Sequence, residues 1–92
     1  MHKTIVGVDY RHPLVTAYVQ IVGRSEQPTE RSAKEVADYL RRSLPDAQVE
    51  PPRFKGFSPQ YGKLLFEVPV ILGAVTPTDR AVFAELLLRG AV

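Results

Sequence analysis

The chain has 92 residues, of which 45% are hydrophobic and 24% charged, so it can bury one hydrophobic core but has no room for a second domain. Its formal net charge of +2 lacks the concentrated basic excess that is typical of a dedicated duplex-DNA binder. Cysteine is absent, which excludes disulfides, thiolate zinc sites and cysteine nucleophiles.

The N-terminal quarter of the chain predicts a β-hairpin. Residues 4–9 and 14–22 are rich in Val, Ile, Thr and Tyr, and they flank the turn-forming residues 10–13. Pairing Val8 with Val15 brings the apolar side chains of both strands to one face, which is the expected core face.

A helix is predicted next, after a linker over residues 23–28. Thr29 or Ser32 can serve as its N-cap, and Pro45 stops it after residue 44. Its apolar residues recur at helical spacing and predict one buried face, which consists of Ala33, Val36, Ala37, Leu40 and Leu44.

A second hairpin and a second helix complete the pattern. Residues 53–57 predict a strand, residues 58–62 a turn, and residues 63–72 an apolar return strand in which Pro69 indicates an edge or a bulge. Thr76 and Gly90 are typical caps for a helix over residues 77–89.

The order ββαββα predicts an α+β two-layer sandwich, in which a four-stranded, mainly antiparallel sheet carries both helices on one face. Residues 1–92 then form a single domain. An alternative is that the two hairpin-plus-helix halves form a continuous sheet only through dimerisation. A homodimer is therefore a second possibility. The sequence contains no recognisable signal peptide or membrane span, and a cytoplasmic protein without membrane contact is expected.

The sequence contains no motif that is typical of a catalytic, metal-binding or cofactor-binding site. The two histidines, His2 and His12, lack a third ligand, and we interpret His12 with Asp9 as a hydrogen-bonded turn pair. Ser25 and Ser32 are explained by linker and cap positions. Neither strand-to-helix junction has the glycines of a phosphate-binding loop, so we expect no metal, no cofactor and no enzyme.

One cluster combines cations with aromatic rings and contains no acid. Its members are Arg53, Phe54, Lys55, Phe57, Tyr61 and Lys63. Such a cluster can bind single-stranded nucleic acid, because bases stack on aromatic rings while cations follow the phosphates. The structural interpretation, which we favour, is that Phe54 and Phe57 anchor the second hairpin in the core while the cations keep an edge strand soluble.

Our first functional hypothesis is a non-enzymatic binding module that docks on another protein, as an adaptor or inhibitor of a larger prokaryotic or phage-targeted complex. Docking would use a sheet edge, the open sheet face or the surplus apolar side of the last helix. The candidate interface residues are Tyr18, Leu65, Ile71, Leu87 and Leu88. Single-stranded nucleic-acid binding by the second hairpin is the alternative, and an enzyme with an unrecognised site is a third.

Overall fold

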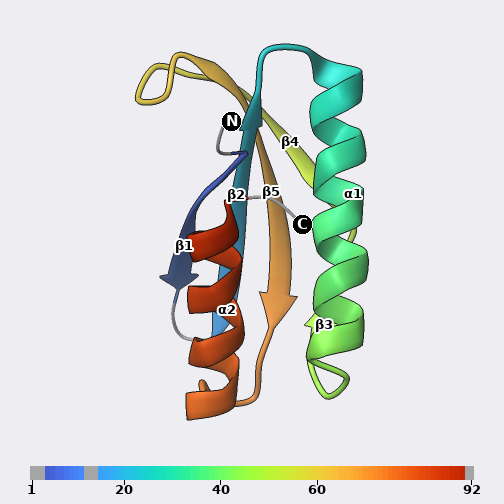
Figure 1. Ribbon diagram of the computed structural model, residues 1–92, viewed down its shortest axis with the longest axis vertical. Coiled ribbons are helices and arrows are strands. Elements are labelled where there is room, and N and C mark those ends of the chain that lie inside the picture. The colour runs from blue at the N-terminus through green and yellow to red at the C-terminus, as the bar shows by residue number, and fades with distance from the viewer. Residues whose placement is uncertain (1–3, 12–14, 91–92) are drawn as a thin grey trace.

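A computed structural model describes residues 4–11 and 15–90 of the chain. Strands and helices follow one another in the order ββαβββα (Figure 1). The elements are β1 (Ile5–Arg11), β2 (Thr16–Gly23), α1 (Glu26–Ser43), β3 (Gln48–Val49), β4 (Arg53–Ser58), β5 (Lys63–Ile71) and α2 (Pro77–Arg89). The predicted order is thus confirmed, with the short strand β3 added before the second hairpin.

The strands form one antiparallel sheet in the order β1-β2-β5-β3, and β4 also pairs with β5. Val70 of β5 pairs with Val49 of β3, whereas Glu67 of β5 pairs with Arg53 of β4. Strands β3 and β4 are therefore successive parts of one edge, interrupted at Pro51 and Pro52, which cannot donate ladder hydrogen bonds. The predicted four-stranded arrangement holds when this broken edge is counted once.

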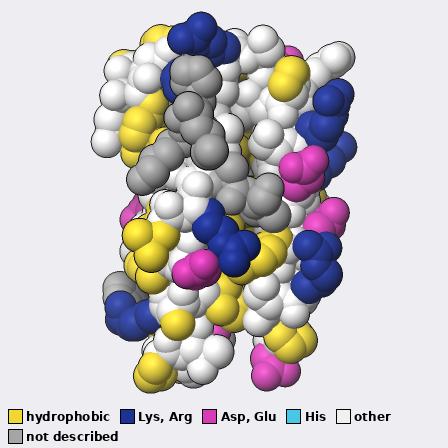
Figure 2. Space-filling view, in the orientation of Figure 1, with side chains coloured by type: hydrophobic (Ala, Val, Ile, Leu, Met, Phe, Trp, Pro, Cys, Tyr) yellow, Lys and Arg dark blue, Asp and Glu magenta, His cyan; other side chains and the backbone are white. Residues whose placement is uncertain are grey.

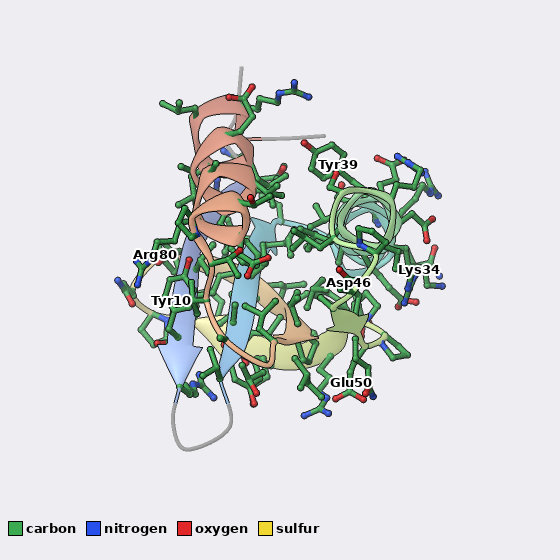
Figure 3. The ribbon with its side chains drawn as sticks, turned by 90° about the horizontal axis from the view of Figure 1, so that it is seen from below. Tyr10, Lys34, Tyr39, Asp46, Glu50 and Arg80 are labelled. Carbon is green, nitrogen blue, oxygen red and sulfur yellow. The ribbon has the colours of Figure 1, made fainter. Side chains whose placement is uncertain are left out.

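Both helices lie on the same side of the sheet, as the view from below shows (Figure 3). Helix α1 packs on β2, β5 and β3, and helix α2 packs on β1. The core between the layers joins apolar residues from both helices and from the inner face of the sheet. Its largest fully buried members include Phe83, Ile5, Ile21, Leu40 and Leu86. The predicted α+β sandwich with two helices on one face is confirmed.

The predicted register of the first hairpin is wrong. Val8 pairs with Val19 instead of Val15, and β1 continues through Tyr10 and Arg11, which the sequence assigned to the turn. Contacts across the fold explain the longer strand. Tyr10 packs edge-on against Phe83 of α2, with ring centroids 6.0 Å apart, and Arg11 reaches Glu67 of β5.

Helix α1 begins earlier than predicted. Its first residue is Glu26 and Ser25 occupies the N-cap position, so part of the expected linker is helical. Pro28 is tolerated there because the amide groups of the first helical turn have no acceptor within the helix. Thr29, one of the two predicted caps, lies inside the helix, and its hydroxyl donates to the carbonyl oxygen of Ser25 at 2.5 Å.

Pro69 was expected at an edge or a bulge, but β5 is an inner strand between β2 and the broken edge. The carbonyl oxygen of Pro69 accepts a hydrogen bond from the amide of Glu50 at 2.9 Å. The nitrogen of a strand residue points to the same side as its carbonyl oxygen. The missing N–H of Pro69 therefore faces the break in the neighbouring edge, where no ladder bond is lost.

Neither helix among residues 4–11 and 15–90 is both long and apolar enough to cross a membrane.

Candidate functional site

The predicted cation-aromatic cluster lies in the β4–β5 hairpin, whose tip extends clear of both helices (Figure 1). The pleat divides the cluster between two faces of the sheet. Phe54 pairs with Phe66 and Phe57 pairs with Leu64, which places both phenylalanines on the helix side. The cations Arg53 and Lys55 lie on the other side of the sheet. Arg53 is the strand partner of Glu67, and the ammonium group of Lys55 lies near the Glu67 carboxylate.

We call this opposite side the open face, because no helix covers it. Its inner part consists of Tyr18, Gln20, Leu65, Glu67, Pro69 and Ile71. Tyr61 in the hairpin turn joins it through its hydroxyl, which donates to the side-chain oxygen of Gln20 at 3.4 Å. Lys63, paired with Ser58 at the start of β5, belongs to the same face by alternation.

The two phenylalanines of β4 are exposed, so the expectation that they anchor the hairpin in the core is wrong. Phe54 is 49% exposed and Phe57 is 63% exposed. The ring of Phe54 rests against that of Phe66, with centroids 5.1 Å apart, whereas Phe57 lies nearer the hairpin tip. The physical reason is that α1 packs on β2, β5 and β3, so the helix layer ends before it reaches the outer part of β4.

A buried carboxylate organises the open face. Glu67 is only 3% exposed, yet it lies outside the hydrophobic core. A guanidinium nitrogen of Arg11 donates to it at 3.3 Å, and the ammonium group of Lys55 lies 3.9 Å from its other oxygen. A buried charge needs such partners, and here they reach across the sheet from both edge strands.

Arg11 is held in place by several groups at once. It donates to the Asp9 carboxylate at 2.8 Å, and its guanidinium lies 4.2 Å above the centre of the Tyr18 ring. The hydrogen bond to Asp9, together with the nearby charge of Glu67, raises the pKa of Arg11 above its usual value. One face of the Tyr18 ring is therefore occupied by a cation–π contact with Arg11.

The five predicted interface residues fall on two surfaces. Tyr18, Leu65 and Ile71 share the open face, and each is half-buried. Leu87 and Leu88 lie on α2, where Leu87 packs partly against the core and Leu88 is 78% exposed. The structure thus brings the first three together and separates them from the last two.

The described residues contain no cluster of metal ligands. Within residues 4–11 and 15–90, no three His, Cys, Asp or Glu side chains converge on one point. His2 and His12 lie outside the described residues, and the Asp9 carboxylate accepts a hydrogen bond from Arg11. A hollow of about 570 Å³ between the end of α1 and the start of α2 is lined by Asp79, but this carboxylate is engaged in capping Thr76.

Two features of the site escaped the sequence analysis. The role of Arg11 depends on a contact with Glu67 that spans 56 residues, which no local pattern reveals. The exposure of Phe54 and Phe57 had a signal in Pro51 and Pro52, because consecutive prolines mark an edge strand that need not be covered.

We found no match for this chain among protein families, curated proteins or solved structures.

Proposed function

We propose that this protein is a non-enzymatic module that docks on another protein through the edge strand β4, as an adaptor or inhibitor of a larger complex. The observation that carries the proposal is the pair of exposed phenylalanines, Phe54 and Phe57, on a strand at the edge of the sheet. Complete burial of a fully exposed Phe side chain contributes about 1.5 to 3 kcal/mol, and Phe54 and Phe57, which are already partly buried, would each contribute part of that.

Strand β4 combines two features that protein partners use. Edge strands carry main-chain groups that can pair with an added strand, and exposed aromatic side chains provide anchors for a partner's pockets. The exposed Leu88 of α2 offers an apolar contact without a free strand edge. The open face has no free strand edge, and its two tyrosines, Tyr18 and Tyr61, are half-buried and engaged with Arg11 and Gln20.

Single-stranded nucleic acid is less well supported by the same residues. Its binding needs aromatic rings and cations on one surface, so that bases stack while phosphates meet positive charge. The phenylalanines of β4 lie on the helix side, whereas Arg53, Lys55 and Lys63 lie on the open face. Tyr61 is the one ring of the cluster on that face, and its hydroxyl is hydrogen-bonded to Gln20. Arg53 is also paired with Glu50 at 3.1 Å, which reduces the charge available to a phosphate.

Capture of partners from an extract of the source cells tests the proposal. We expect Phe57→Ser to fold like the natural protein, since Phe57 is already largely exposed, and to lose the partner that the natural protein retains. Leu88→Ser is the matched control, because it also removes an exposed large apolar side chain, and it should retain the partner. Loss in the Leu88 variant alone would contradict docking through β4 and would place the interface on α2.

A further inference from the structure

We propose that the partner docks by adding an extended segment to the outer edge of β4, and that apolar and acidic side chains alternate along this segment. The inference rests on the proposed function and specifies its partner. Three properties of β4 carry it: its unpaired edge, the division of its side chains between two faces, and its charge.

The outer edge of β4 is free. The strand pairs with β5 on one side only. No other part of residues 4–11 and 15–90 makes a main-chain hydrogen bond to its outer side. A strand that is added here would pair its main chain with these groups, as happens in many peptide-recognition domains.

The side chains of β4 specify the pattern of the added strand. Neighbouring strands place side chains of the same face next to each other. On the helix side an added strand would meet Phe54 and Phe57, which favours apolar residues. On the open face it would meet Lys55 and also Arg53, which pairs with Glu50 at 3.1 Å, and these two cations favour acidic residues. Because successive residues of a strand alternate between faces, the two preferences together require an alternating sequence.

The positive charge of β4 favours a different protein, and not a second copy of this chain, as the strand that is added to its edge. Arg53 and Lys55 are both exposed, and Lys55 lies 3.9 Å from the carboxylate of Glu67, a distance that leaves its ammonium group able to reach another acid. Two copies of β4 paired with each other would bring these cations together.

The probe for this inference is a synthetic peptide in which valine and glutamate alternate, flanked by Gly-Ser segments for solubility. Lysine replaces glutamate in a second peptide. In a titration followed by NMR of the labelled full chain, we expect the glutamate peptide to bind and to shift the amide signals of β4. The lysine peptide should bind roughly tenfold more weakly or not at all.

A pair of protein variants tests whether the charges of β4 cause this preference. The double variant Arg53→Gln, Lys55→Gln should lose most of the preference for the glutamate peptide, because it lacks the two cations of the edge. The double variant Lys34→Gln, Arg42→Gln makes the same charge change on α1 and should keep the preference. The amide spectrum of each free variant shows whether it is folded.

The outcomes separate the inference from the function on which it rests. If neither peptide binds, or both bind equally, the alternating acidic strand is wrong. The capture experiment is judged separately. If Phe57→Ser loses the partner there, docking through β4 stands even when neither peptide binds. If Phe57→Ser retains the partner, the proposed function fails as well. If a single-stranded oligonucleotide displaces the glutamate peptide from β4, the partner is a nucleic acid and the inference is overturned.

Discussion

Tyr10 shows how one residue couples the edge of the sheet to a helix. Its ring lies edge-on to Phe83, and the guanidinium of Arg80 is 5.9 Å from the ring centre. Figure 3 shows Tyr10 and Arg80 close together at the outer margin of β1 and α2. Partial burial raises the pKa of the Tyr10 hydroxyl, although the charge of Arg80 acts in the opposite direction.

The raised pKa of Tyr10 predicts a loss of stability at high pH. In the unfolded chain the phenol ionises near its ordinary pKa of 10.0, whereas in the folded protein it keeps its proton to higher pH. This contribution to stability is therefore fully present below pH 10 and is lost as the pH rises through the folded pKa. The difference in free energy of unfolding between the natural protein and Tyr10→Phe, measured from about pH 8 to about pH 11, should shift in favour of the variant. A constant difference would contradict the assignment.

At the scale of elements, the junction between β2 and α1 depends on a close approach. A side chain at Gly23 would collide with the hydroxyl oxygen of Thr29. Thr29 is buried, and its hydroxyl is committed to the carbonyl oxygen of Ser25, so it has little freedom to move away. The tight turn from strand to helix therefore requires the absence of a Cβ atom at position 23.

Gly23→Ala should lower the free energy of unfolding by about 1 to 3 kcal/mol, because the added methyl group overpacks the junction. Gly73→Ala provides the control, since a Cβ atom there meets nothing within 4 Å. It should change stability by less than about 0.5 kcal/mol. Chemical denaturation of both variants measures the effect, and equal stabilities would show that the junction relaxes freely.

The elements could be predicted to the extent that their signals are local. The capping box of Thr76 and Asp79 and the left-handed Gly90 fixed the bounds of α2 correctly. The register of the first hairpin could not be predicted, because Tyr10 and Arg11 are kept in β1 by residues far along the chain. The exposure of Phe57 likewise depends on where the helix layer ends. Of the candidate site, the sequence identified the hairpin but assigned its phenylalanines to the core.

At the scale of the whole molecule, the exposed surface of α1 differs in character from that of the β4–β5 hairpin. Along the side of α1, basic and acidic side chains are mixed, as Figure 2 shows on the right. Ion pairs such as Lys34 with Glu30 and Arg41 with Asp38 neutralise this surface. The β4–β5 hairpin differs, since it exposes two phenylalanines on one side and cations on the other. This contrast supports the proposal that a partner docks at this hairpin and not on α1.

Photo-crosslinking tests the central claim, docking of another protein through β4, most directly. A photoreactive phenylalanine derivative at position 57 replaces an exposed aromatic side chain with one of similar shape, and the same derivative at position 34 on the outer side of α1 provides the comparison. In the source cells we expect one defined adduct with a different protein from position 57 and none from position 34. The account would be contradicted if position 57 gave no adduct, gave the same adducts as position 34, or gave only an adduct of two copies of this chain.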